Sequence, residues 1–166
     1  PSHSELSFKV KHLMISNVQG AFRKFTAEIN GDNFMNAPIQ VVIESSSIYT
    51  NDESRDGHLK AADFFDAENH PQIKFQSSSM EHLHDNQYKL LGELTIKGLA
   101  RPVSLELEFG GLNKDPWGNE KMAFSLQGKI SRKEWGLNWN ATLESGGVLV
   151  SDEVKINAEI QMVKQA

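Results

Sequence analysis

Three basic side chains crowd a short polar segment of the chain. Arg55, His58 and Lys60 are close in sequence, with Asp56 between them. Placed in the first turns of a helix, whose dipole favours anions, they would bind a phosphate or carboxylate group. A solvated helix face with an Asp56–Lys60 pair worth about 0.2–0.5 kcal/mol is the alternative interpretation. A position at the rim of a pocket would favour the anion site.

The histidines suggest a second kind of site, one that binds a metal ion. His82 and His84 form an HxH pair beside an expected turn, but no third ligand is forced into reach, and structural zinc normally takes four good ligands. Other potential ligands gather around the expected helix: His58, Asp63, Asp66 and His70. We expect no functional metal.

Catalytic signatures do not occur in the sequence. It contains no GxSxG motif and no GxGxxG or GxxxxGK[ST] phosphate loop. Glu106 and Glu108 alternate with apolar residues and are expected to face solvent. His12 directly follows an expected strand, and we interpret it as a loop cap or part of a pocket mouth, because no partner for a base is identifiable. We therefore expect no catalytic residues and no enzyme activity.

The elements that must position these residues are strands, identified by strict alternation of apolar and polar side chains. The clearest segments, together with the more ambiguous stretch 18–29, give about eight strands. They are residues 6–10, 39–43, 73–75, 90–96, 103–109, 122–130 and 154–162. Turn residues join them at 30–32, 85–86, 98–102 and 115–118.

Strands with one apolar face predict an all-β antiparallel fold. A sheet of about eight such strands avoids exposed edges by closing into a barrel, whose interior is filled by side chains or holds one small ligand. A sandwich is the alternative architecture. The 166 residues contain no linker or repeat, so we expect a single domain over residues 1–166.

One segment, Thr50 to Pro71, interrupts the strand pattern. Thr50 and Glu53 have capping-box spacing, and apolar residues recur at about one helical turn as far as Phe65. This predicts an inserted helix that ends before Pro71 and covers one opening of the barrel. A second capping pattern at residues 131–134 predicts a single helical turn.

Composition excludes several partners. The net charge of -5 has no basic stripe, so nucleic acid is not expected. No apolar run approaches the ~18 residues of a transmembrane helix.

The absence of cysteine and of a signal-like start at Pro1 favours the cytoplasm, whereas a mature or trimmed chain would be compatible with a periplasmic or secreted protein.

The combination of these segments resembles the YceI-like family of lipid-binding proteins. The matching segments extend over nearly the whole chain. They include FKVKH at 8–12, GAF at 20–22, RDGHLK at 55–60, DFFD at 63–66, GELTIKG at 92–98, and SR with WGL at 131–137. The resemblance implies a lipocalin-like barrel with an elongated hydrophobic cavity that takes up long apolar chains such as polyisoprenoids.

Our hypothesis from the sequence is noncatalytic binding, transport or storage of a long-chain amphiphilic lipid. The lipid is a polyisoprenoid, an isoprenoid quinone precursor or a fatty-acid derivative, and no other cofactor is expected. The residues expected to line its tail lie on apolar faces: Phe8, Val10, Leu13, Phe22, Val41, Ile43, Leu59, Phe64, Phe75, Leu94, Ile96, Leu105, Phe124 and Trp139. Those expected near its head are His12, Arg55, Asp56, His58 and Lys60.

Two alternatives stay open at this point. An enzyme could act on a lipid in the same pocket through His12, His58 or Asp56. A stress-related interaction module would instead have a barrel filled by side chains and a partner on its outer face. The sequence does not fix the oligomeric state, and a homodimer is compatible with either hypothesis.

Overall fold

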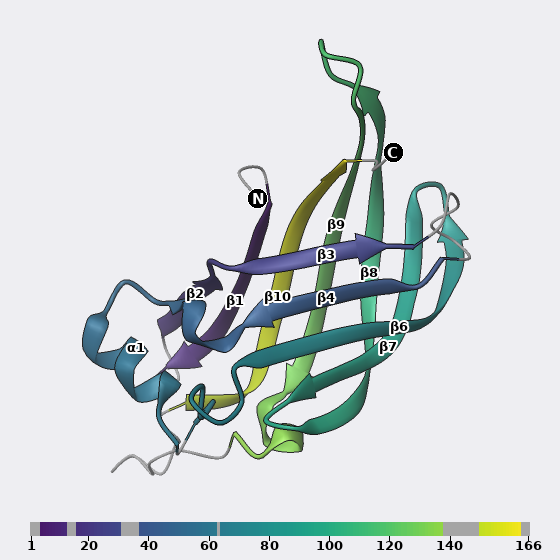
Figure 1. The fold of residues 1–166 in the computed structure, drawn as a ribbon. Helices are drawn as coiled ribbons and strands as arrows, with labels where there is room; N and C mark the ends of the chain where they lie inside the picture. Colours follow the sequence, from purple (N-terminus) through teal and green to yellow (C-terminus); the bar gives the residue numbers. More distant parts are fainter. Residues whose placement is uncertain (1–3, 13–15, 31–36, 63, 138–149, 164–166) are drawn as a thin grey trace.

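The chain forms one antiparallel sheet that curls round on itself (Figure 1). A computed structural model describes residues 4–12, 16–30, 37–62, 64–137 and 150–163. In this part of the chain ten strands follow the order β3-β4-β6-β7-β8-β9-β10-β1-β2-β5. Their bounds are β1 Glu5–His12, β2 Ser16–Phe22, β3 Phe25–Ile29, β4 Ile39–Glu44, β5 Ile48–Tyr49, β6 Gln72–His84, β7 Gln87–Ile96, β8 Leu99–Lys114, β9 Glu120–Ser131 and β10 Val150–Val163.

The sheet returns to its starting edge through one continuous segment. Strands β2 and β3 are separated only by Arg23 and Lys24, yet β2 pairs with β1 and β3 pairs with β4. Arg23 N donates to Ser47 O at 3.1 Å, and Glu44 N donates to Lys24 O at 3.0 Å, which holds the bend. The antiparallel barrel-like fold is confirmed. The expected eight strands become ten because residues 18–29 divide here and because β5 is an additional two-residue strand.

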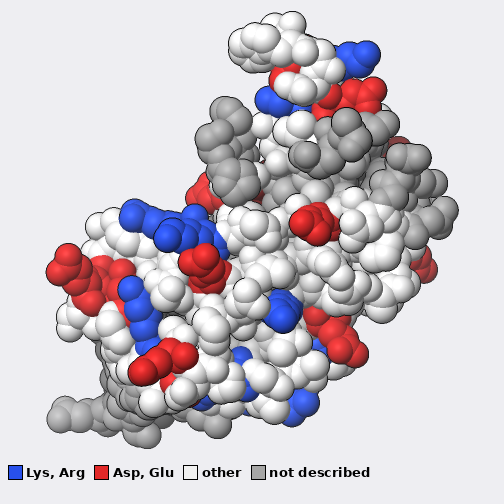
Figure 2. All heavy atoms as spheres, in the orientation of Figure 1, with Lys and Arg blue, Asp and Glu red and all other residues white. Residues whose placement is uncertain are grey.

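Alternation along the strands separates the inside of the sheet from its outside. In β4, Ile39, Val41 and Ile43 are buried while Gln40 and Glu44 are exposed. The same inward rows from the other strands form one hydrophobic core. Figure 2 shows acidic and basic side chains interspersed over the outer face. The apolar interior expected from the sequence pattern is therefore present.

The inserted helix is shorter than the sequence predicts. Helix α1 covers Glu53–Lys60, and its N-cap is Asp52, whose side chain accepts a hydrogen bond from Arg55 N at 3.0 Å. Thr50, the expected cap, bonds instead to Asp56. The chain leaves helical geometry at Ala61, and the following turn buries Phe64. None of the helices in the described residues is long and apolar enough to cross a bilayer.

The described turns agree with the expected positions, with two corrections; residues 31 and 32 of the turn expected at 30–32 lie outside the described residues. The 3₁₀ helix η1 covers Ser45–Ser47, and η2 covers Arg132–Trp135, the single turn expected there, although the Ser131 hydroxyl bonds to Asp152 rather than capping it. The turn expected over residues 98–102 is tighter. Lys97 and Gly98 make it with positive φ angles of 53° and 75°, so β8 begins at Leu99.

Candidate ligand-binding cavity

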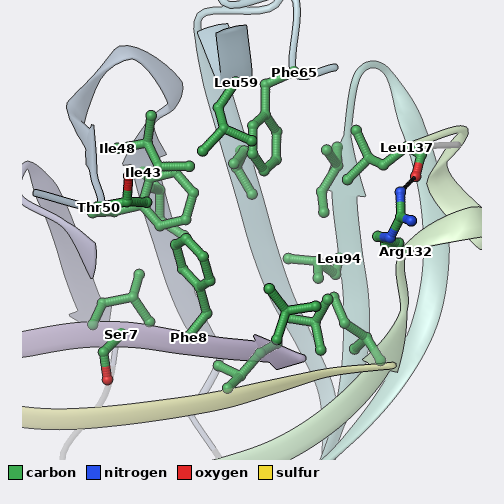
Figure 3. A pocket seen from close by; sticks show the side chains of 18 of the residues that line it. Ser7, Phe8, Ile43, Ile48, Thr50, Leu59, Phe65, Leu94, Arg132 and Leu137 are labelled. Carbon is green, nitrogen blue, oxygen red and sulfur yellow. Dashed lines mark hydrogen bonds between the residues drawn. The ribbon is translucent and has the colours of Figure 1, made fainter. Parts of the chain in front are cut away.

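The curled sheet surrounds an apolar cavity of about 450 Å³. In Figure 3, Phe8, Leu94, Leu59 and Phe65 point into it from strands and from the α1 side. Most of the side chains expected to contact a lipid tail lie along its wall. These are Phe8, Val10, Phe22, Val41, Ile43, Leu59, Phe64, Phe75, Leu94, Ile96 and Leu105.

Three of the expected tail residues are not placed in the cavity wall. Phe124 is buried, with 5% of its surface exposed, but it packs beside Phe109 at a ring-centroid distance of 5.8 Å and does not line the cavity. Phe124 therefore belongs to the packed core beside the cavity, and its contact with a lipid tail stays a prediction. Leu13 and Trp139 lie outside the described residues.

Sequence reasoning named only part of the apolar wall. The missed residues lie on the same alternating faces or beside the helix, so the period-two pattern already contained the signal for most of them. They are Leu6, Val18, Phe25, Ile48, Phe65, Ile73, Val103, Leu126, Ile130, Leu137, Val154, Ile156, Ala158 and Ile160.

One end of the cavity is polar. Its wall there includes Thr50 and Asp52 together with Ser54, Arg55 and His58 of α1. The anion-site hypothesis therefore has its basic residues at a pocket rim. Among the other residues expected near a head group, Asp56 and Lys60 do not line the cavity. The side chain of His12, at the end of β1, lies outside the described part of the chain.

A hydrogen-bonded cluster fixes Arg55 at this rim. Asp56 Oδ1 accepts from Thr50 N at 2.9 Å and from the Thr50 hydroxyl. The same hydroxyl accepts from Arg55 Nε at 2.8 Å, and Arg55 Nη2 donates to Thr50 O, also at 2.8 Å. Because Thr50 and Asp56 are both buried, Asp56 orients the guanidinium through Thr50. The Nη1 group of Arg55 has no hydrogen-bond partner among the described residues.

A second cation, Arg132, lines the cavity from η2. Only 2% of its surface is exposed, and Nη1 donates to Leu137 O (Figure 3). Burial lowers the pKa of this guanidinium below its ordinary value, while attraction to Asp152 opposes the shift. An isolated charge is costly to bury, so these partners are what keep Arg132 in the wall. Its signal in the sequence was its place in the SR segment at 131–132.

His82, the first histidine of the HxH pair, makes contacts within its own hairpin. The His82 ring nitrogen Nε2 lies 2.9 Å from Asp85 O at the β6–β7 turn, and the ring lies against Tyr88. Near the helix, His70 and Asp66 are 4.0 Å apart. Among the residues that the structure describes, no three or more side chains of metal-binding type are grouped to hold an ion.

A curled antiparallel sheet around an apolar cavity with one polar rim places the chain in the class of cavity-containing β-barrel proteins. The chain belongs to the YceI-like domain family, whose sequence profile matches residues 1–162. The resemblance found from the motifs is thereby confirmed.

Relatives agree in sequence and in fold. A UPF0312 protein of Staphylococcus aureus (strain N315) is 37% identical over 163 residues, covering 96% of this chain and 92% of that protein. The Campylobacter jejuni YceI protein superposes with a TM-score of 0.80 at 34% identity, covering 95% of this chain and 91% of that one. Burkholderia cenocepacia BcnA gives 0.83 at 25% identity, with 97% of both chains covered.

A more distant structure shares the fold alone. It is described as a polyisoprenoid binding domain from Saccharophagus degradans implicated in plant cell wall breakdown. Its TM-score is 0.73 at 13% identity, with 98% of this chain and 94% of that chain covered. The architecture is therefore kept where few residues are shared.

Proposed function

We propose that the chain is a noncatalytic binding protein that transports or stores a long-chain amphiphilic lipid, such as a polyisoprenoid, an isoprenoid quinone precursor or a fatty-acid derivative. The observation that carries this proposal is the cavity of about 450 Å³, whose wall is apolar except for Ser7 of β1 and the polar residues contributed by α1, η2 and the segment before α1. Small-molecule sites combine such walls with a few polar groups that fix one end of the ligand. An amphiphilic lipid has the corresponding two parts, an apolar tail and one polar head.

The tail lies among the inward rows of the strands, where it replaces water against apolar carbon. Each buried methylene contributes about 0.8 kcal/mol, which corresponds to about a fourfold gain in affinity. Since the apolar wall offers few directional groups, several related chains bind. The distant neighbour described as a polyisoprenoid binding domain supports the view that this fold accommodates such a tail.

The head lies at the rim, against Arg55 and His58. A guanidinium forms bidentate, charge-assisted hydrogen bonds with phosphate or carboxylate, and Thr50 holds Arg55 for this contact. Asp56 acts as a positioning residue. Lys60, at the end of α1, does not line the cavity. A contact of His12 with the head stays a prediction from the sequence.

Native mass spectrometry of freshly purified protein, followed by lipid extraction and uptake of added prenyl alcohols, tests the proposal. A copurifying or captured lipid is the expected result. Ala158→Phe, which fills the cavity from β10, should abolish uptake, whereas Asn157→Phe on the exposed face of the same strand should not. Circular dichroism verifies that both variants fold. Absence of bound lipid and of uptake in the unaltered protein would contradict the proposal.

A further inference from the structure

The interior is hollow along only part of the barrel. On β9, Leu126 and Ile130 line the cavity, but Met122 and Phe124, further along the same face, do not. On β10, Ile160 lines it, whereas Met162 packs against the core. Along β9, the lining residues lie nearer η2, and Met122 and Phe124 lie nearer the β8–β9 hairpin.

Three buried side chains on neighbouring strands form the boundary between these parts. We call Leu90, Leu107 and Phe124 the inner wall; their exposed fractions are 1%, 1% and 5%. Each is paired across the sheet with a residue that lines the cavity. Leu90 pairs with Leu105, Leu107 with Leu126, and Phe124 with Ile160. The cavity therefore ends where the inner wall begins.

Behind the inner wall the interior continues as packed side chains. Phe109 lies 5.8 Å from Phe124 between ring centroids, and Met122 and Met162 pack against the same core. Protein interiors are packed like organic crystals, so a ligand atom enters such a layer only by displacing side chains. A tail that reaches the inner wall meets packed side chains and, in the part of the chain that the structure describes, no further apolar space.

Resting on the proposed function, we infer that the inner wall sets the maximum length of the lipid tail, with Phe124 as the main length-determining residue. Affinity rises about fourfold per methylene while the tail has cavity to fill. Beyond the length at which the tail meets Phe124, added methylenes stay in water or force repacking, and affinity stops rising. Chains beyond this length therefore bind no more tightly than a chain of the limiting length, and the protein discriminates only against shorter ones.

Substitutions on one face of β9 test the inference from both sides. Phe124→Ala removes the ring and opens the cavity toward Phe109, so the length at which affinity levels off should increase. Leu126→Phe fills the last part of the cavity, so that length should decrease. Met122→Ala is the matched control, because it truncates a side chain on the same face one step farther from the cavity and should leave the limit unchanged.

The measurement is isothermal titration calorimetry with saturated fatty acids that increase in two-carbon steps. In the unaltered protein each step should raise affinity roughly fifteenfold up to a limit and leave it unchanged afterwards. Opposite shifts of that limit in Phe124→Ala and Leu126→Phe support the inference. An identical limit in the unaltered protein and all folded variants, or affinity that rises over the whole series, overturns it.

Two outcomes distinguish failure of this inference from failure of the proposed function on which it rests. If neither fatty acids nor prenyl alcohols bind to the unaltered protein, the proposed function fails as well. If they bind but the limit does not move, only the role of the inner wall is wrong. Should Phe124→Ala not fold, as judged by circular dichroism, Leu126→Phe with its shift toward shorter chains decides the question alone.

Discussion

Thr50 and Asp56 are joined by two hydrogen bonds at the start of α1, one from the Thr50 backbone N–H at 2.9 Å and one from its hydroxyl. Both residues are buried, with exposed fractions of 5% and 7%. Because the hydroxyl also accepts from Arg55 Nε, this pair couples the stability of the helix start to the position of the cation at the cavity rim.

Thr50→Val should destabilise the protein and disorder Arg55. The change leaves Asp56 with one hydrogen bond fewer in a buried place and leaves Arg55 Nε without its acceptor, which costs about 1–3 kcal/mol. Urea unfolding measures this loss. Thr50→Ser, which keeps the hydroxyl, should retain most of the stability. Equal losses in the two variants would assign the effect to packing of the methyl group.

Arg55→Gln should discriminate between lipids with charged and uncharged heads. Hydrogen bonds to charged groups contribute about 1.5–3 kcal/mol, so affinity for a prenyl phosphate should fall about tenfold or more. Affinity for the corresponding prenol should change little. Competition binding with both lipids measures the ratio, with Lys60→Gln as a control on the same helix outside the cavity wall. Equal losses for both lipids would contradict a head-group contact.

The inward faces of the barrel could be predicted from sequence because alternation encodes them directly. Val41 and Ile43 lie in the cavity wall as expected from their strand pattern alone. Phe124 shows the limit of that pattern, because its direction is inward but its level along the barrel is packed. Whether an inward side chain meets space or other side chains depends on residues contributed by distant strands.

Local sequence patterns predict the rim of the cavity less well, because tertiary contacts there override them. Thr50 and Glu53 have capping-box spacing, yet Asp52 caps α1 since Thr50 is engaged by Asp56. Arg132 was missed as a residue of the wall because an arginine is expected to face solvent. Its burial depends on partners such as Leu137 O that no local spacing reveals.

Acidification should loosen the turn that joins β8 and β9. Asp115 accepts from Asn119 Nδ2 at 3.0 Å and from the backbone N–H groups of Trp117 and Asn119, each at 2.9 Å. These bonds, first of all that from the Asn119 side chain, lower the pKa of Asp115 below its ordinary 3.8. The stabilisation is therefore complete above the ordinary pKa and is lost as the pH falls through the lowered one.

An NMR titration of the Asp115 carboxyl carbon checks this sign. Its midpoint should lie below 3.8, and Asn119→Ala should move it upward toward that ordinary value. Lys121 stands 3.8 Å away and contributes less, so Lys121→Gln should move the midpoint less than Asn119→Ala. A midpoint at or above the ordinary value in the unaltered protein would contradict the role of these hydrogen bonds.

Two glycines should respond to alanine in opposite directions. A Cβ atom on Gly92 of β7 would lie 2.5 Å from the backbone oxygen of Gln76 and 2.7 Å from the ring of Phe75, whereas one on Gly57 of α1 would meet no atom within 4 Å. Gly57→Ala should stabilise the protein by about 0.5–1 kcal/mol because alanine loses less backbone entropy in a helix. Gly92→Ala should destabilise it by about 1–3 kcal/mol through overpacking.

The two glycine substitutions also distinguish an effect on stability from an effect on ligand binding. Phe75 lines the cavity, so a Cβ on Gly92 that displaces its ring changes the shape of the wall and should weaken lipid binding as well as stability. Gly57 does not line the cavity, so Gly57→Ala should raise the urea midpoint and leave affinity unchanged. Binding that is unaffected in a folded Gly92→Ala variant would show that Phe75 adjusts without closing space on the tail, and that the wall is softer there than its packing indicates.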